Sequence, residues 1–392
     1  MKWFLGFLGL LATGSAGALI YAPYLPDLIA EGVPGVIYSG QGQYVAIGNP
    51  AEPSPLTIAP DAATRPLESP VAEVFAGQMG EALLVYRDGM LSLEHYAGGA
   101  GPQTRFNSFS MAKSLVGGLV FKALADGRIS SLDQPLSAYL PQTENLGGVT
   151  LRSLLTMRSG IAFDGGGSFG SVAGKQDDTS PNPFGALARL HYTGLDRVVP
   201  TLAVDREKED QFNYENINTA LLGALVSRVY GKPLPEVLSD QIWRPAGASE
   251  ALWRRPPNAD DVSAYCCIYA TARDWIRVGR YINANGTPDA PFLPDALWRD
   301  YLGLEVPMPA RQANNYGLHV WQNVLDRSGQ ELQGPFSYFM GQFGQTLYLM
   351  PDKGLVVYRA GEGVPLLHST LYGAWNSSRQ PPLPNRTSTS IR

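Results

Sequence analysis

The sequence is poor in cysteine and in charged residues. Its only two cysteines, Cys266 and Cys267, are neighbours and cannot connect distant segments of the chain. A disulfide between adjacent cysteines is possible but strained, so two small buried thiols beside a loop are the favoured interpretation, and the redox state of the pair stays open. Charged residues make up 17% of the 392 residues, and no long run of Lys or Arg occurs. The composition therefore gives no sign of a nucleic-acid partner, and we expect none.

Histidine is scarce as well. The chain has four histidines, and none stands at a spacing from another histidine, a cysteine or a carboxylate that is typical of a zinc site. They are His95, His191, His319 and His368. We therefore predict no metal and no cofactor, and we expect each histidine to be structural or exposed.

The first 22 residues have the pattern of a targeting segment. Lys2 precedes an apolar stretch that runs from Phe4 to Ala22 and contains the small residues 16–18, as a signal peptide does. The stretch is also close to the roughly 20 residues that span a bilayer. We expect either a cleaved signal peptide or a membrane anchor formed by residues 3–22. Either one places the rest of the chain in the periplasm or outside the cell.

Composition divides the rest of the chain into three parts. Residues 23–66 are rich in Pro, Gly, Ala and Ser, which indicates a linker or an N-terminal arm that wraps around the fold. Residues 376–392 are polar and rich in Pro, as in a disordered tail. Residues 67–375 remain as one large domain, and a chain of this length can bury a large core.

Two predicted hairpins frame this domain. Asp88-Gly89 separates the apolar runs 82–86 and 90–94, and a Pro-Asp-Lys-Gly turn separates the runs 345–350 and 355–359. Helical patterns lie between the hairpins, at Met111–Ala125, Val149–Met157 and Asn216–Tyr230. Strands, then helices, then strands predict an α+β fold in which both chain ends complete one antiparallel sheet. The helical insertion covers about residues 128–260.

Ser110 and Lys113 form the first candidate catalytic pair. If Met111 opens the predicted helix, Ser110 stands at its N-terminus and Lys113 lies one turn further on the same face. A serine hydroxyl needs a base, and burial lowers the pKa of a lysine enough for that role. The helix N-terminus adds backbone N–H groups for a developing oxyanion. A serine cap followed by a solvated lysine would give the same pattern.

Tyr214 and Asn216 are the next candidates, because they stand two apart on a loop that opens the predicted helix at 216–230. Close to the Lys113 ammonium, the phenolate form of Tyr214 would be favoured and could act as a general base. Asn216 is expected to bind a substrate carbonyl or to hold Lys113. The structural alternative is a tyrosine packed under the sheet and an asparagine that caps the helix.

These two motifs together resemble a known group of enzymes. Ser110-x-x-Lys113 followed by Tyr214-x-Asn216 is similar to the first two signatures of the serine β-lactamase and D-alanyl-D-alanine peptidase superfamily. The similarity is to its Tyr-containing branch, which includes class C β-lactamases, family VIII-type carboxylesterases and 6-aminohexanoate-dimer hydrolases. It extends over roughly residues 75–360. The resemblance implies a β-lactamase/transpeptidase-like fold and a mechanism without a required histidine.

The third signature of that superfamily, often Lys-Thr-Gly or His-x-Gly on a strand, is best matched by Phe339-Met340-Gly341. Gly341 keeps the glycine, as a close approach of the backbone to substrate requires. The basic residue is missing, because Phe339 stands in its place. In the resembling β-lactamases and peptidases that residue helps to hold a substrate carboxylate. Its loss argues against β-lactam or peptidoglycan substrates and favours an ester or amide.

The resemblance also implies two further site positions. The backbone N–H of Gln342 would join that of Ser110 in an oxyanion hole. Tyr265, with the adjacent Cys266, would lie on a loop that borders the substrate pocket.

We therefore predict a serine hydrolase that cleaves a small-molecule carboxylic ester or amide through an acyl-enzyme on Ser110. Two alternatives stay open. One is a β-lactamase or a D-alanyl-D-alanine carboxypeptidase of the penicillin-binding type. The other is a catalytically idle binding protein on the same scaffold.

A rival motif lies at residues 166–170, where Gly-Gly-Ser-Phe-Gly fits the G-x-S-x-G of α/β-hydrolases. Asp352 and His368 follow in the chain order of that triad. The motif needs a strand before its serine and a helix after it, whereas glycine-rich segments stand on both sides here. A glycine-rich loop explains the residues better.

Overall fold

The computed structural model describes residue 20 and residues 22–32, 34–48, 53–163, 183–257, 259–326, 329–363 and 367–381. Seven strands from the two ends of this chain form one antiparallel sheet. They are β2 (Gly80–Arg87), β3 (Met90–Tyr96), β11 (Asn315–Gly317), β12 (Val320–Leu325), β13 (Gly334–Met340), β14 (Thr346–Met350) and β15 (Leu355–Gly361). Their order in the sheet is β11-β12-β13-β14-β15-β2-β3.

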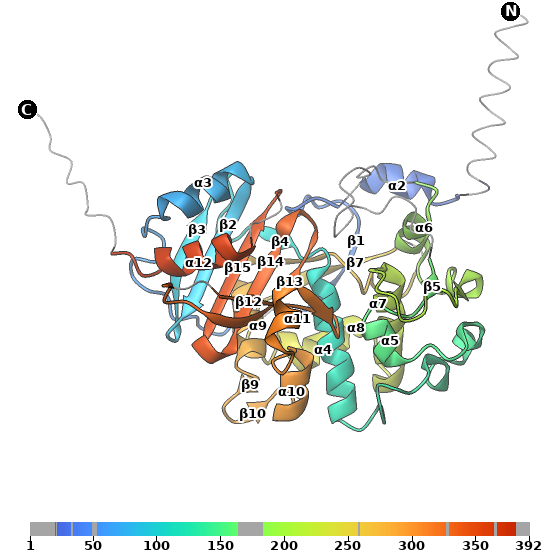
Figure 1. Ribbon diagram of the computed structural model, residues 1–392. Helices are drawn as coiled ribbons and strands as arrows, with labels where there is room; N and C mark the ends of the chain where they lie inside the picture. The colour runs from blue at the N-terminus through green and yellow to red at the C-terminus, as the bar shows by residue number, and fades with distance from the viewer. Residues whose placement is uncertain are drawn as a thin grey trace, which may run out of the picture.

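The early hairpin β2–β3 thus pairs through β2 with the last strand, β15 (Figure 1). Both predicted hairpins are present, with their turns at Asp88-Gly89 and at residues 351–354. The α+β fold with a sheet completed from both chain ends is confirmed.

Helices cover both faces of this sheet (Figure 1). α3 (Ser69–Gly77) and α12 (Leu367–Ser377) pack on one face, and α9 (Ala272–Asn283) packs on the other against β2, β14 and β15. Side chains alternate along each strand, so β2 contributes to two apolar cores. Leu83 and Val85 belong to the core under α3 and α12, whereas Leu84 belongs to the core on the α9 side.

A group of helices stands beside the sheet, around α4 (Met111–Ala125) (Figure 1). The others are α5 (Leu151–Leu155), α6 (Ala186–Thr193), α7 (Asn216–Tyr230) and α8 (Leu234–Leu238). Apolar or small side chains occur on all sides of α4, so it is buried along most of its length. It contacts α7 and α8 within the helical group and β13 in the sheet. α4 therefore belongs to both halves of the molecule.

The bounds of α4 and α7 agree with the prediction, but α5 is shorter than the predicted helix at 149–157. Thr150 and Ser153 form a capping box, which starts the helix at Leu151. Met157 adopts a positive φ of 58°, which is incompatible with continuing a right-handed helix.

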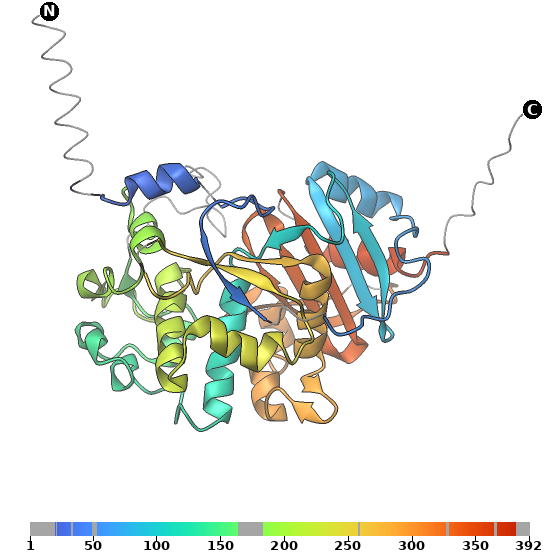
Figure 2. The same cartoon turned by 180° about the vertical axis from the view of Figure 1, so that it is seen from behind.

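Residues 23–66 are more ordered than a linker. They contain α2 (Leu25–Glu31) and β1 (Gln43–Ile47), and β1 pairs with β7 (Ala251–Arg255). This pair continues through β8 (Ile268–Thr271) to β4 (Arg105–Asn107), in a second, four-stranded sheet. Figure 2 shows this N-terminal segment crossing the rear of the molecule. Of the two predicted forms, a linker and a wrapping arm, the described part of this segment fits the wrapping arm, and it supplies a strand to the second sheet.

The remaining described elements are short. They are β5 (Ile161–Ala162) paired with β6 (Ala203–Val204), β9 (Gly286–Thr287) paired with β10 (Ala290–Pro291), α10 (Asp295–Tyr301) and α11 (Met308–Gln312).

The predicted tail boundary at residue 376 is too early. α12 continues to Ser377, and both Ser377 and Ser378 are buried. The Ser378 carbonyl accepts hydrogen bonds from Arg65, which precedes α3, and from Arg87, the last residue of β2. These contacts extend the folded domain past the predicted boundary, whereas residues 382–392 lie outside the described residues.

The predicted signal peptide or membrane anchor falls almost wholly outside the described residues, of which only 20 and 22 belong to it. Ala22 is buried in a small core with Tyr24, Ala188 and Tyr192. None of the helices in the described ranges is both long and apolar enough to cross a bilayer.

His319 links the helices that carry the candidate catalytic residues. It lies in the turn between β11 and β12, where its φ is 67°. Its Nδ1 bonds the Leu155 carbonyl of α5 at 2.8 Å, and its Nε2 bonds Thr219 Oγ1 of α7 at 2.8 Å. Its own carbonyl accepts a hydrogen bond from Ser114 Oγ of α4. The predicted structural role of this histidine is therefore correct, and burial lowers its pKa to about 3.

This pKa makes stability depend on pH. An unfolded histidine takes up its proton near pH 6.5, whereas folded His319 does so only at about pH 3. Between these values the unfolded state binds the proton and the folded state does not. Stability should therefore fall as the pH drops below 6.5, by about 1.4 kcal/mol per unit for each such histidine.

His319→Asn tests this prediction, because asparagine tolerates a positive φ and does not titrate. We expect the variant to be less stable at pH 7 but to lose less stability between pH 6.5 and pH 4, as measured by urea unfolding. Equal losses in wild type and variant would show that His319 does not titrate in this range.

Candidate active site

Ser110 and Lys113 lie together at the start of α4, as the sequence predicted. Ser110 is the N-cap residue of the helix, and Lys113 Nζ lies 2.8 Å from Ser110 Oγ. Lys113 is only 1% exposed, so the alternative of a solvated surface lysine is excluded. Its Nζ also donates a hydrogen bond to the Tyr265 carbonyl, at 3.1 Å.

Burial lowers the pKa of Lys113 to about 7, because the charged ammonium loses its hydration. Glu215 opposes this effect, since a nearby negative charge favours the ammonium and raises the pKa. The balance leaves a large fraction of Lys113 neutral near pH 7. A neutral amine at hydrogen-bond distance from Ser110 can accept the hydroxyl proton.

Tyr214 completes the group. Lys113 Nζ lies 5.0 Å from the centroid of the Tyr214 ring, and the Tyr214 hydroxyl shares a hydrogen bond with the Ser110 side chain. The ring stacks on Trp321 at 6.1 Å and meets the edge of Tyr316 at 5.6 Å. Because Trp321 and Tyr316 lie on β12 and β11, the edge of the sheet holds Tyr214 against the nucleophile.

The expected phenolate form of Tyr214 is not favoured in this environment. Burial raises the pKa of Tyr214 well above its ordinary value, and the hydrogen bond from Ser110 offsets only part of the rise. Lys113, partly neutral, cannot supply the constant positive charge that the prediction assumed. Tyr214 is therefore a neutral phenol, which suits a proton donor better than a resting base.

Asn216 is the first residue of α7, and Glu215 is the N-cap residue. The Asn216 side chain is half-buried and makes no hydrogen bond within the part of the chain that the structure describes. Its position next to Tyr214 agrees with the prediction, while its contact with a substrate carbonyl or with Lys113 stays a prediction.

Gly341 brings the end of β13 against the segment that precedes the nucleophile. A Cβ atom at Gly341 would lie 2.2 Å from the Ser108 carbonyl oxygen and 2.9 Å from Phe109 Cβ. Only glycine fits such a contact. The sequence predicted a close approach to substrate, but the structure shows that the close approach is to the backbone beside Ser110.

This contact sets the two predicted oxyanion donors on adjacent backbone segments. Gln342 follows Gly341 and opens a short 3₁₀ turn, residues 342–344. Among the described residues, the backbone N–H groups of Ser110 and Gln342 donate no hydrogen bond. Both groups are thus unoccupied donors on segments that touch, which is the requirement for an oxyanion hole.

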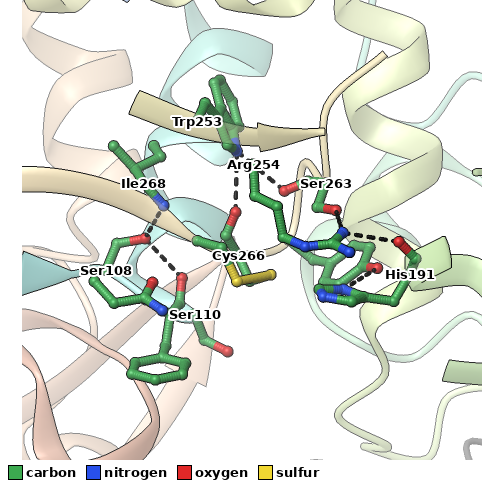
Figure 3. Close-up of a disulfide and its surroundings, with 12 residues drawn as sticks. Ser108, Ser110, His191, Trp253, Arg254, Ser263, Cys266 and Ile268 are labelled. Atoms are coloured by element: carbon green, nitrogen blue, oxygen red, sulfur yellow. Dashed lines mark hydrogen bonds between the residues drawn. A yellow bond between two sulfur atoms is a disulfide. The ribbon is translucent and has the colours of Figure 1, made fainter. Parts of the chain in front are cut away.

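The backbone before Ser110 is strained and firmly held. Phe109 has a φ of 42°, which a bulky side chain rarely adopts, and its N–H bonds Asn107 Oδ1 at 2.8 Å. Ser108 is fixed to Ile268 of β8 by two hydrogen bonds, one from the Ser108 N–H at 2.7 Å and one to Ser108 Oγ at 2.9 Å (Figure 3). No sequence signal marked these residues.

Arg359 is a second feature that sequence reasoning missed. This buried residue of β15 donates hydrogen bonds to the carbonyls of Phe343 at 2.8 Å and Gly344 at 3.1 Å. Its other Nη donates to the Gln78 carbonyl at 2.8 Å. The guanidinium therefore braces the turn that carries the Gln342 N–H. An arginine in a β-strand gives no hint of this role in the sequence.

Tyr265 contacts the site mainly through its backbone. Its carbonyl accepts the hydrogen bond from Lys113, and its ring centroid lies 5.9 Å from Lys113 Nζ. Its side chain is buried, and its hydroxyl lies 3.2 Å from His191 Nδ1. Tyr265 thus belongs to the candidate site, behind Lys113.

Of the two states left open for the cysteine pair, the less favoured one is found. Cys266 and Cys267 are both buried, as expected, but they form a disulfide with each other (Figure 3). The pair lies in a turn in which Cys267 has a φ of 72°.

Phe339, which replaces the basic residue of the third signature, is fully buried. Its ring lies 6.4 Å from Tyr301 in the core beside α4. The position therefore contributes to packing and brings no positive charge to the site.

The rival serine at residue 168 lies outside the described residues. Asp352 lies in a turn between β14 and β15, and His368 on α12 is hydrogen-bonded to Asn323. The antiparallel sheet also differs from the mostly parallel sheet that an α/β-hydrolase needs. In the described part of the chain, no group of three or more potential ligands could hold a metal ion.

Comparisons with known proteins bear on the same region. The Beta-lactamase family pattern matches residues 71–365. The 6-aminohexanoate-dimer hydrolase of Paenarthrobacter ureafaciens is 29% identical over 210 residues, which make up 53% of this chain and 52% of the relative. The chain spans only a third to about half of the length of the curated relatives that it matches.

Solved structures share the fold. A protein from Bacillus anthracis, provisionally named a 6-aminohexanoate-dimer hydrolase, has a TM-score of 0.66 and 19% identity, with 86% of this chain and 90% of that one covered. EstCE1, described as a hydrolase with promiscuous acyltransferase activity, has a TM-score of 0.56 and 15% identity, with 79% and 99% covered. At these identities the likeness concerns the fold alone. The family match over most of the chain, together with this fold, shows that the protein belongs to the Beta-lactamase family.

Proposed function

We propose that this protein hydrolyses a carboxylic ester or amide through an acyl-enzyme formed on Ser110. The observation that carries the proposal is the buried Lys113 amine, with a pKa of about 7, at 2.8 Å from Ser110 Oγ. A lysine buried for structural reasons is normally paired with a carboxylate. Lys113 instead contacts a hydroxyl and a carbonyl, which is the environment of a base.

The proposed proton path follows from the lowered pKa of Lys113 and the raised pKa of Tyr214. Neutral Lys113 accepts the proton of Ser110 as Oγ attacks the substrate carbonyl carbon. The tetrahedral oxyanion is stabilised by the backbone N–H groups of Ser110 and Gln342. Tyr214 donates its proton to the leaving oxygen or nitrogen and is reprotonated by the Lys113 ammonium. Water then releases the acyl group by the reverse path, which restores the Ser110 hydroxyl.

The surroundings of Ser110 favour an uncharged substrate. Phe339 supplies no cation for a substrate carboxylate, and the turn that carries Gln342 presents Phe343, which is 37% exposed. The rings of Phe343 and Phe109 meet edge to face at 5.4 Å, next to the nucleophile. Apolar rings here suit a neutral acyl or leaving group.

Turnover of a short-chain p-nitrophenyl ester by wild type and Ser110→Ala tests the proposal. We expect a loss of at least about 10³-fold in kcat/KM in the variant, because the nucleophile is gone. A chromogenic cephalosporin, run in parallel, should not be cleaved. Rapid cephalosporin cleavage would instead favour a β-lactamase, and ester turnover that survives in the variant would remove Ser110 from the mechanism.

The pH dependence follows from the Lys113 pKa. Because only the neutral amine accepts the Ser110 proton, kcat/KM should rise with pH with a midpoint of about 7 and then level off. Glu215 raises this pKa, so Glu215→Gln should move the midpoint to lower pH. Stopped-assay rates between pH 5 and pH 9 measure both. A midpoint that does not move in Glu215→Gln would contradict the assignment of Lys113 as the titrating base.

Tyr214→Phe separates the roles of the base and the acid. A p-nitrophenolate leaves without protonation, whereas an alkoxide or amine must receive a proton. We expect the variant to lose about 10²–10⁴-fold in kcat/KM on an alkyl ester of a given acid and much less on its p-nitrophenyl ester. Equal losses on the two substrates would show that Tyr214 is not the proton donor.

A further inference from the structure

We propose that the disulfide between Cys266 and Cys267 positions the catalytic base, Lys113, and that its reduction by a small dithiol lowers turnover. The inference rests on the proposed function, because it concerns the same lysine. The disulfide lies on a segment that bonds the base at one end and the backbone just before the nucleophile at the other. Figure 3 shows Cys266 and Ile268 beside Ser108 and Ser110.

The segment Tyr265–Ile268 connects Lys113 to Ser108, which precedes the nucleophile by two residues. At its start, the Tyr265 carbonyl accepts the hydrogen bond from Lys113 Nζ at 3.1 Å. At its end, Ile268 exchanges two hydrogen bonds with Ser108, two residues before the nucleophile. Cys266 and Cys267 are the two residues in between. Any change in the backbone of the cysteines therefore moves the acceptor of Lys113 relative to Ser110.

The rest of the segment is anchored from behind. The Cys266 carbonyl accepts a hydrogen bond from Trp253 Nε1 at 3.0 Å, and the Cys267 carbonyl accepts one from the Arg254 N–H at 3.0 Å. Arg254 is itself buried and ion-paired with Glu31. The frame behind the disulfide is rigid, so the conformation of the two cysteines decides where the Tyr265 carbonyl points.

Cys267 holds an unfavourable conformation. Its φ of 72° lies in the left-handed region, which a residue with a side chain avoids unless its surroundings impose it. The disulfide closes a small ring through the peptide bond between the two cysteines, and this ring restrains the φ of Cys267. Once the bond is reduced, the ring opens and Cys267 is free to return to a negative φ.

Reduction proceeds by two exchanges. A thiolate of the dithiol attacks one cysteine sulfur, forms a mixed disulfide and releases the other cysteine as a thiolate. The second thiol of the reagent then displaces the first cysteine, so the reagent ends as a cyclic disulfide and the protein as two thiols. Cys266 is the more exposed of the two, at 9% against 2% for Cys267, so we expect the attack there.

The consequence for catalysis is a misplaced base. Without the Tyr265 carbonyl in position, the Lys113 amine loses one of its two hydrogen-bond partners and its fixed distance to Ser110 Oγ. Small displacements of a catalytic group cost about 10-fold to 10²-fold in rate. Substrate binding should change little, because the segment reaches the nucleophile region from behind Lys113.

The experiment compares the full chain in its oxidised form with the same protein after treatment with dithiothreitol. Alkylation and mass spectrometry count the free thiols, and these are the only two cysteines in the chain. We expect kcat for the p-nitrophenyl ester to fall about tenfold at nearly constant KM and unchanged melting temperature, and to recover on reoxidation. The measured kcat should therefore follow the ratio of reduced to oxidised dithiothreitol in the assay.

The double variant Cys266→Ser with Cys267→Ser is the matched control. It should show the lower kcat of the reduced enzyme with or without dithiothreitol. If kcat is equal in the oxidised enzyme, in the reduced enzyme in which both thiols are alkylated, and in the double variant, the proposal is overturned. A fall in kcat that only follows a fall in melting temperature would also overturn it, because the bond would then be merely structural.

The two proposals fail in different ways. Turnover by the oxidised protein that depends on Ser110 establishes the hydrolase first, and an absent effect of reduction then removes only the role of the disulfide. Absence of that turnover in the oxidised protein would instead remove the proposed function.

Discussion

The burial of one amine is the constraint on which the rest of the site depends. A lysine ammonium prefers water strongly, and excluding water lowers the pKa of Lys113 to about 7. Relative to its ordinary value, this shift corresponds to on the order of 5 kcal/mol against the charged form. A Ser–Lys pair in solvent would have a protonated lysine and an inert serine. The chemistry therefore comes from the environment of the pair, and the fold supplies that environment.

Each half of the molecule contributes to this environment. The helical group surrounds α4, so that Lys113 is enclosed by packing on all sides of its helix. The sheet contributes its edge, where Trp321 and Tyr316 hold Tyr214 against the pair. It also contributes the end of β13, where Gly341 touches the backbone before Ser110. The candidate site lies where the two halves meet, so neither half alone could provide both the proposed buried base and the proposed oxyanion hole.

Local patterns carried the successful part of the sequence prediction. The bounds of α4 and α7, the hairpins and the Ser110–Lys113 spacing all depend on residues a few positions apart, and such signals can be read from a chain. Tyr214 was proposed from its place on a loop before a predicted helix, whereas Gln342 needed the resemblance to a known family. The features that were missed depend on distant or conformational information. β1 pairs with β7 about 200 residues away in the chain. Arg359 of β15 donates a hydrogen bond to the turn between β13 and β14. The positive φ values of Phe109 and Cys267 occur at residues other than glycine, so the sequence does not mark them.

The most direct test of this account is the titration of Lys113 itself. Lysine labelled with ¹³C at Cε reports the protonation of its amine by NMR, and Lys113→Arg assigns the signal by its disappearance. Ser110→Ala protein can be used, so that no turnover interferes. The account predicts one lysine that titrates with a midpoint of about 7. A Lys113 signal that stays protonated up to about pH 10, the ordinary range for lysine, would contradict the claim that burial makes this residue the base.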